Sequence, residues 1–141
     1  MANYVSKCRT NYFAVMDVEK FTDIMKHLSG DGEIDFYEHA SDKGKYMFYC
    51  DGVLNGYMND PDDDDSIDDA TGQMIKELQA ILPDGEAIIL TEAGSEKMNY
   101  ISCVATIITN NTTGYVNLYD VALEKARTIL GNPEYNTQLD Y

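Results

Sequence analysis

The pairing of strand-like segments across short turns constrains this fold more than any other sequence feature. Residues 33–39 and 45–51 are both strand-like, and the turn sequence Ser41-Asp-Lys-Gly44 lies between them. Residues 86–91 and 100–109 form a second pair, for which we predict a connection through Ala93-Gly94-Ser95. Consecutive strands joined by short turns pair antiparallel, so the sequence predicts an antiparallel sheet.

Three segments have the apolar spacing of helices. Phe21, Ile24, Met25 and Leu28 share one side of a helix over residues 18–28, and Asp17 precedes it as an N-cap. The same reasoning predicts helices over residues 66–82 and 118–130, the last ended by Gly131. The remaining expectations are a first strand over residues 10–16, a bend over 52–56 and a short strand over 115–118.

The order of these segments indicates the fold class. It predicts an α+β protein with an antiparallel sheet of five to six strands and about three helices packed on it. The β-α-β-β-α-β order is also compatible with a ferredoxin-like variant that carries an added hairpin and a C-terminal helix. We expect a single domain over residues 1–141, with an acidic loop at residues 59–69.

The charge of the chain limits its partners. It has 25 acidic and 10 basic residues, a formal net charge of -15, and 44% hydrophobic residues, enough for a core. Such a surface repels phosphate and anionic lipid, so we expect no direct binding to nucleic acid or membranes. No apolar run is long enough to span a bilayer and the first residues lack a secretory signal, so we expect a cytoplasmic protein.

An aspartate run is the strongest local feature. Seven of the eleven residues from 59 to 69 are Asp, and about half of the excess negative charge lies there. One interpretation is a solvated loop that keeps the protein soluble. The other is a row of carboxylates that imitates the charge of a DNA duplex and binds a basic partner. The candidate partner-binding residues are Asp60, Asp62, Asp63, Asp64, Asp65, Asp68 and Asp69, with Glu77 in support.

Calcium is the most specific alternative for this run. An EF-hand loop that began at Asp60 would place Asp62 and Asp64 at positions 3 and 5. Position 6 would be Asp65 instead of Gly, however, and position 12 would be Thr71 instead of Glu. We therefore predict no metal site and no cofactor, and a divalent-metal-responsive regulator stays as an alternative function.

No catalytic motif is present in the sequence. The chain has no nucleophile elbow, phosphate-binding loop or dinucleotide fingerprint, and no partner at motif spacing for His27 or His39. Cys8, Cys50 and Cys103 are far apart and are expected to be reduced thiols packed in the core. We predict a protein that is not an enzyme, and an enzyme with an unrecognised site remains a further alternative.

Three segments carry a family resemblance. Residues 9–17, residues 82–97 and the ending Leu130-Gly-Asn-Pro…Thr137-Gln-Leu-Asp-Tyr141 resemble small acidic accessory proteins of bacterial phages and conjugative elements. The resemblance implies a mobile-element setting, which also contains inhibitors of restriction and CRISPR nucleases. We therefore expect a non-enzymatic DNA mimic that binds and inhibits a basic nucleic-acid-handling or host-defence protein. The sequence does not determine its oligomeric state.

Overall fold

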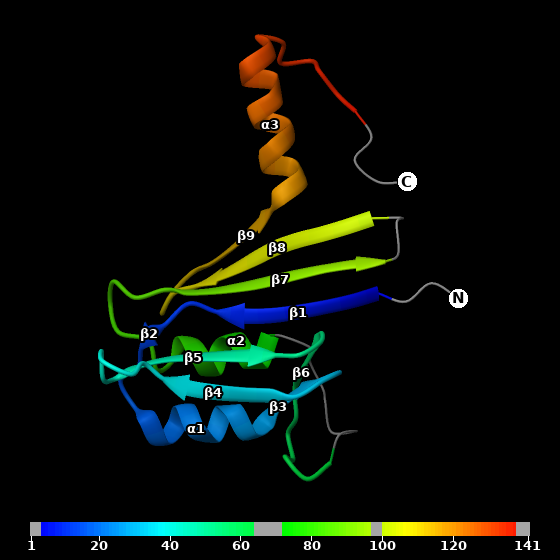
Figure 1. Cartoon of the computed structure of the whole chain (residues 1–141). Coiled ribbons are helices and arrows are strands. Elements are labelled where there is room, and N and C mark those ends of the chain that lie inside the picture. The colour runs from blue at the N-terminus through cyan, green and yellow to red at the C-terminus, as the bar shows by residue number, and fades with distance from the viewer. Residues whose placement is uncertain (1–3, 64–71, 97–99, 138–141) are drawn as a thin grey trace.

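The computed structural model of the chain describes residues 4–63, 72–96 and 100–137. Its largest element is a seven-stranded sheet with antiparallel neighbours (Figure 1). The strands are β1 (Tyr4–Thr10), β2 (Phe13–Ala14), β4 (Ile34–Glu38), β5 (Lys45–Cys50), β7 (Ile88–Glu96), β8 (Tyr100–Ile108) and β9 (Thr113–Asn117). They follow the order β2-β5-β1-β7-β8-β9, and β4 also pairs with β5. The described residues therefore have the predicted α+β class with a mostly antiparallel sheet.

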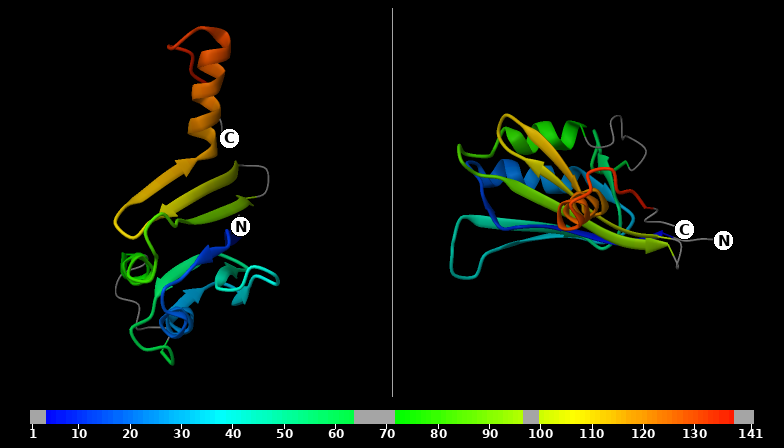
Figure 2. Two further views of the ribbon diagram at one scale, coloured as in Figure 1. Left: turned by 90° about the vertical axis from the view of Figure 1, so that its left-hand side faces the viewer. Right: turned by 90° about the horizontal axis from the view of Figure 1, so that it is seen from above.

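Two helices cover one face of this sheet, α1 (Val18–His27) and α2 (Gly72–Gln79) (Figure 2). α1 begins where predicted, because the Asp17 side chain accepts a hydrogen bond from the Lys20 amide at 3.1 Å. Its predicted apolar stripe is confirmed, since Phe21, Ile24, Met25 and Leu28 are all buried. These side chains join the main core, which also contains Phe13, Phe48, Met74, Leu78, Ile81, Leu82, Ile88 and Ile108.

A small two-stranded ribbon follows α1. β3 (Leu28–Gly30) pairs with β6 (Leu54–Tyr57), a segment that the sequence predicted only as a bend. The Met58 amide donates to the His27 carbonyl at 2.7 Å, which fixes the end of β6 beside the end of α1.

The last helix, α3 (Leu118–Leu130), has the predicted bounds but does not pack on the sheet. It extends from β9 away from the body of the molecule (Figure 1), and none of its residues is buried. The expectation that all three helices pack on the sheet is therefore wrong for α3. Within the described residues, only α1 and α2 have buried side chains that cover the sheet.

The predicted first strand is placed too late in the sequence. β1 ends at Thr10, and the expected strand over residues 10–16 contains only the two-residue β2. The side chains that β1 turns towards the helices include Ser6, Cys8 and Thr10, which are all buried. Because these residues are small or polar, they give no clear apolar alternation, and this hid the strand.

The predicted connection at Ala93-Gly94-Ser95 is also wrong, because these residues lie inside β7. Gly94 is required there by close packing: a Cβ atom would lie 2.6 Å from the Ser6 Cβ. The predicted hairpin over residues 33–51 is confirmed, with Gly44 at φ 90° in its turn. α2 falls within the predicted helix 66–82, whose residues 66–71 lie outside the described ones.

The described residues contain no helix with the length and apolar character that a membrane crossing requires.

Candidate functional site

The described part of the aspartate run forms a tight turn on the surface. Asp60, Asp62 and Asp63 are exposed. The Asp60 carboxylate accepts from the Asp62 amide at 3.0 Å, and the Asp60 carbonyl accepts from the Asp63 amide at 3.0 Å. These bonds fix the course of the backbone at the start of the run. The other candidate residues of the run, Asp64, Asp65, Asp68 and Asp69, lie outside the described residues.

Glu77 lies on α2 close to the strand that leads into the run. It is half-buried, and its Oε1 accepts from the Gln73 side chain at 2.8 Å. Burial raises the pKa of Tyr57, and the negative charges of Glu77 and Asp23 raise it further. Carboxylates of α1 and α2 therefore both lie near Tyr57, two residues before Asn59.

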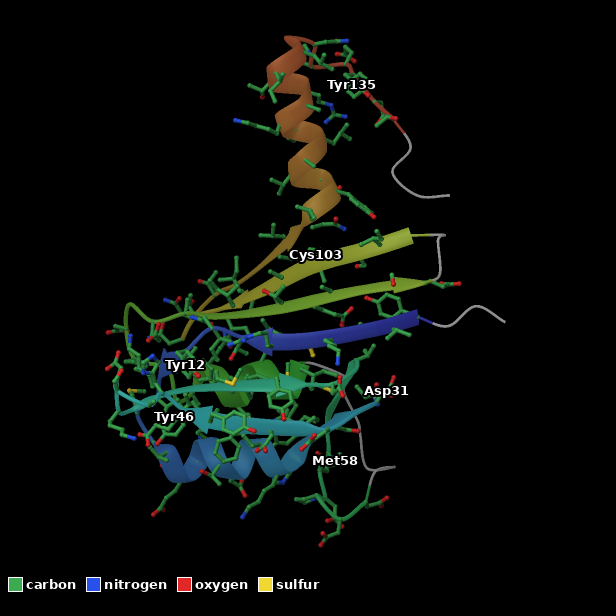
Figure 3. The ribbon with its side chains drawn as sticks, viewed as in Figure 1. Tyr12, Asp31, Tyr46, Met58, Cys103 and Tyr135 are labelled. Atoms are coloured by element: carbon green, nitrogen blue, oxygen red, sulfur yellow. The ribbon has the colours of Figure 1, made fainter. Side chains whose placement is uncertain are left out.

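Further acids lie beside the first residue of β4 and the last residue of β5. These two residues are paired, so the acids share one end of the sheet (Figure 3). The Asp31 amide donates to the Val53 carbonyl at 2.9 Å, and the Asp51 amide donates to the Glu33 carbonyl at 2.8 Å. The Asn55 side chain donates to the Asp31 carboxylate at 3.0 Å, and Lys7 forms an ion pair with Asp51. We call this region the acidic end, made of Asp23, Asp31, Glu33, Asp51, Asp60, Asp62, Asp63 and Glu77.

The sequence interpretation found half of the acidic end. It named Asp60, Asp62, Asp63 and Glu77 but not Asp23, Asp31, Glu33 and Asp51. The missed residues belong to separate segments of the chain, and the pairing of β3 with β6 and of β4 with β5 brings these segments to one end of the sheet. The one local signal is that Asp31 and Glu33 flank the turn at Gly32.

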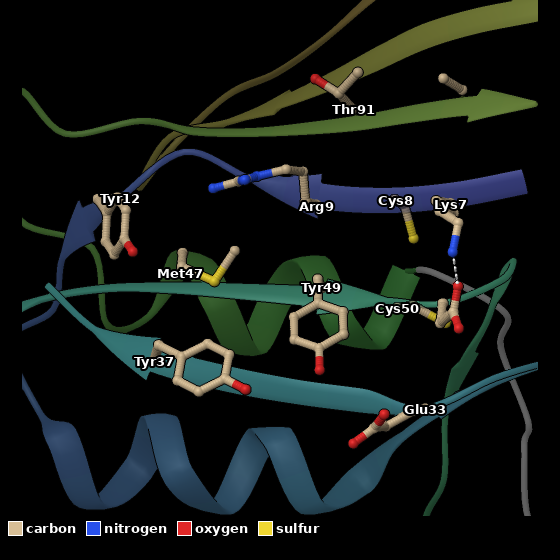
Figure 4. Close-up of a pocket in the computed structure, with 12 residues that line it drawn as sticks. Lys7, Cys8, Arg9, Tyr12, Glu33, Tyr37, Met47, Tyr49, Cys50 and Thr91 are labelled. Atoms are coloured by element: carbon tan, nitrogen blue, oxygen red, sulfur yellow. Dashed lines mark hydrogen bonds and ion pairs between the residues drawn. The ribbon is translucent and has the colours of Figure 1, made fainter.

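A groove of about 740 Å³ opens on the other face of the sheet, between β1 and β5 (Figure 4). Tyr37 and Tyr49 form one wall, with stacked rings whose centroids are 6.1 Å apart and whose planes differ by 9°. The Arg9 side chain extends alongside β1 towards Tyr12 (Figure 4). Its Nε donates to the Thr10 carbonyl at 3.3 Å, and among the described residues it forms no ion pair.

The two thiols that line this groove are unsuited to nucleophilic catalysis. Cys8 and Cys50 are neighbours across the β1–β5 ladder and are both buried, as predicted for core cysteines. Burial, with smaller effects of Cys50 and Glu92, raises the pKa of Cys8 to about 12. Burial also raises the pKa of Cys50. Both thiols are therefore protonated at neutral pH, whereas a nucleophilic cysteine needs its thiolate.

Both histidines have local structural roles. His27 Nδ1 lies 2.9 Å from the Asp23 carbonyl, and its ring stacks on Tyr57 with centroids 4.8 Å apart. His39 Nδ1 accepts from the Asp42 amide at 2.9 Å and so orders the β4–β5 turn. In the described part of the chain, no group of three His, Cys, Asp or Glu residues has the arrangement to hold a metal ion.

Comparison with known proteins gives no relative. No protein-family model matches the chain, and no curated protein or solved structure is significantly similar to it.

Proposed function

We propose that this chain is a non-enzymatic protein whose acidic end binds a basic site on a nucleic-acid-handling or host-defence protein, such as a restriction or CRISPR nuclease. It would act as a DNA mimic and inhibit its partner. The observation that carries the proposal is that acids from two separate helices, Asp23 of α1 and Glu77 of α2, both lie near Tyr57, just before the aspartate run. A loop that served only solubility would not need this convergence.

The physical basis is the charge density of DNA. A duplex carries one negative charge per about 1.7 Å of its axis, and its protein partners present matching Lys and Arg side chains. Competition for such a partner requires carboxylates held on a folded surface rather than on a free tail. Three contacts restrain acids of this end: Asp31 with Asn55, Glu77 with Gln73, and Asp60 with the Asp62 amide. The field of the acidic end would also speed the encounter with a basic partner.

The mobile-element setting rests on the resemblance in residues 9–17, 82–97 and 130–141. Such elements carry inhibitors of host nucleases, and this favours a nuclease as the partner over other basic proteins. A cytoplasmic location goes with this proposal, because the nucleases it would inhibit act there. We also propose a ferredoxin-like variant for the β-α-β-β-α-β part, which the antiparallel neighbours β4-β5-β1-β7 support.

Capture from a bacterial lysate tests the proposal. The immobilised protein is expected to retain a nucleic-acid-binding protein at low salt, and either high salt or added duplex DNA should release it. The test variant changes all seven Asp of the run to Asn. The control variant removes the same charge elsewhere, by amide substitution of Glu19, Glu38, Asp42, Asp84, Asp120, Glu124 and Glu134.

The two variants separate a specific surface from bulk charge. We expect capture to be lost in the test variant and kept in the control variant. Equal loss in both would mean that net charge alone holds the partner, and equal retention would mean that the aspartate run has no part in binding. Either result contradicts the proposal.

The groove favours a second candidate function, which is the binding of a small planar anion. Its stacked tyrosines offer a flat aromatic wall, and Arg9 offers a cation with no carboxylate partner among the described residues. Calorimetric titration with a nucleoside monophosphate tests this function. Saturable heat that disappears in Arg9→Gln but remains in Lys43→Gln would support it, and the absence of heat in the wild-type protein would exclude it for that ligand.

A further inference from the structure

α3 has an apolar side that is largely exposed among the described residues. Apolar residues recur at helical spacing through Leu118, Val121, Ala122, Ala126, Ile129 and Leu130. Val121 is 53% exposed, Ile129 74% and Leu130 58%. An isolated helix of this length, 13 residues, is marginal in water, and most helices owe their stability to the packing of such a side.

The chain nevertheless specifies this helix clearly at both ends. The Asn117 side chain accepts from the Tyr119 amide at 2.9 Å as an N-cap, and Gly131 ends the helix in the left-handed region at φ 65°. The Tyr119 hydroxyl accepts from the Ile101 amide at 3.2 Å, which attaches the start of the helix to β8. α3 is thus a defined element that lacks a packing partner within the described residues.

A bare sheet face lies next to this helix. α1 and α2 cover the face to which Ile88 and Ile108 point, and both of these are 0% exposed. Side chains alternate along strands, so Ile89, Ile101 and Val116 point to the opposite face. They are 44%, 65% and 38% exposed. β1 adds Val5 to the same face, because its partner Ser95 lies opposite Ile101.

The surface area indicates how much is left uncovered. The chain exposes 8719 Å², whereas a compact monomer of this mass exposes roughly 7300 Å². The excess is about 1400 Å² per chain. If half of this excess lies on α3 and the bare sheet face, two chains that covered it would bury about 1400 Å², the size of a standard specific interface.

Charge also favours contact at this place. Residues 100–117, which form β8 and β9, contain no Asp, Glu, Lys or Arg, although the whole chain carries a net charge of -15. α3 adds Asp120 and Glu124 but also Lys125 and Arg127, so its charges balance. Two copies can therefore meet here without bringing their acidic surfaces together.

We propose that this protein forms a homodimer in which α3 of each copy packs its apolar side on the bare face of β7, β8 and β9 of the other copy. Each chain provides both surfaces of this contact, the apolar side of α3 and the bare sheet face. Within one chain α3 extends away from the sheet and does not cover that face (Figure 1). A two-fold exchange satisfies both halves at once and closes the assembly. A different protein would have to supply both a groove for the helix and a cover for the sheet.

Sedimentation equilibrium between about 1 and 100 µM tests the dimer, with size-exclusion chromatography and light scattering as a second measurement. We expect the wild-type protein to have twice the chain mass in this range. Val121→Glu combined with Ile129→Glu should raise the dissociation constant about a hundredfold or more, and Ile101→Glu on the sheet face should also weaken the dimer. Ser41→Glu adds the same charge in the exposed β4–β5 turn, away from α3 and from the bare sheet face, and should leave the dimer intact.

The outcomes are distinct. A wild-type protein that stays monomeric at 100 µM overturns the proposal, and so does a dimer that survives Ile101→Glu, because the sheet face then takes no part. All substituted side chains are exposed, so far-UV circular dichroism should show that each variant folds. These variants leave the acidic end unchanged. Failure of the dimer is therefore distinguishable from failure to capture a basic partner.

Discussion

Replacing Thr10 with Val tests how the two parts of the sheet are held together. β1 and β5 pair at Cys8–Cys50 and Arg9–Tyr49, and β1 then ends. Thr10 is 1% exposed and bridges the strands at that point. Its hydroxyl accepts from the Phe48 amide at 3.1 Å and donates to the Asn11 carbonyl at 2.8 Å.

The Phe48 amide has no substitute partner on β4. Backbone hydrogen bonds join His39 to Lys45 and Asp51 to Glu33 across the β4–β5 ladder. Bonded and non-bonded pairs alternate in antiparallel ladders, so the Phe48 amide points away from β4, towards Thr10. Without the hydroxyl, this buried N–H is left unsatisfied.

The expected cost follows from that loss. Val has the shape of Thr but no hydroxyl, and an unsatisfied buried N–H costs about 1–3 kcal/mol. We expect Thr10→Val to lower the free energy of unfolding by about 2 kcal/mol and the midpoint temperature by about 6 °C. Thr10→Ser is the matched control, because it keeps the hydroxyl and removes one methyl group, at a cost of about 1 kcal/mol.

Urea unfolding followed by far-UV circular dichroism measures both variants. The protein concentration must be the same throughout, because dimer formation would make stability depend on it. If the Val variant is as stable as the Ser variant or more stable, the hydroxyl does not join the strands and the reasoning fails.

Three further predictions concern buried groups. A thiol reagent at about pH 8 should modify half-buried Cys103 before Cys8 and Cys50, which are 5% and 1% exposed; fast reaction of all three would contradict the structure. The pKa of Cys8 is raised from its ordinary 9.0 to about 12, so between these values the native state keeps a proton that the unfolded state loses. This contribution to stability is complete below pH 9 and is lost as the pH rises towards 12. Cys8→Ala should therefore lose less stability than the wild-type protein between about pH 8 and about pH 11 in urea titrations, and parallel losses would refute this. Gly32→Ala would place a methyl group 2.0 Å from the Asp51 carbonyl oxygen and should cost about 1–3 kcal/mol in urea unfolding. Gly114→Ala, whose nearest neighbour is 3.8 Å away, should change stability by less than about 1 kcal/mol.

Local signals predicted the helices and the first hairpin well. Asp17 and the stripe from Phe21 to Leu28 define α1, and Gly131 marks the end of α3. These signals succeed because a cap, an apolar spacing and a left-handed glycine act within a few residues. The bounds of β1 failed because its core side carries Ser6, Cys8 and Thr10.

The functional surfaces depend on contacts between distant residues. The acidic end combines Asp23 on α1 with Asp51 after β5, and the β3–β6 ribbon lies between them. In the groove, β5 pairs with both β1 and β4 and so places Arg9 and Tyr37 on the same face. Apart from the two acids that flank Gly32, sequence spacing indicates neither arrangement. The amphipathic pattern of α3 did predict an apolar side in need of cover, but the pattern could not tell that the described part of the chain leaves this side exposed.

Salt separates the two interactions proposed for this protein. Each copy carries a net charge of -15, so two copies repel each other at long range, and salt screens this repulsion. The proposed dimer interface contains the uncharged residues 100–117, so salt has few favourable ion pairs to weaken there. The dimer should therefore tighten as salt rises from about 0.05 M to about 0.5 M, whereas a complex between the acidic end and a basic partner should weaken. A dimer that dissociates as salt rises would be held by charged groups, and α3 and the bare sheet face would then need another occupant.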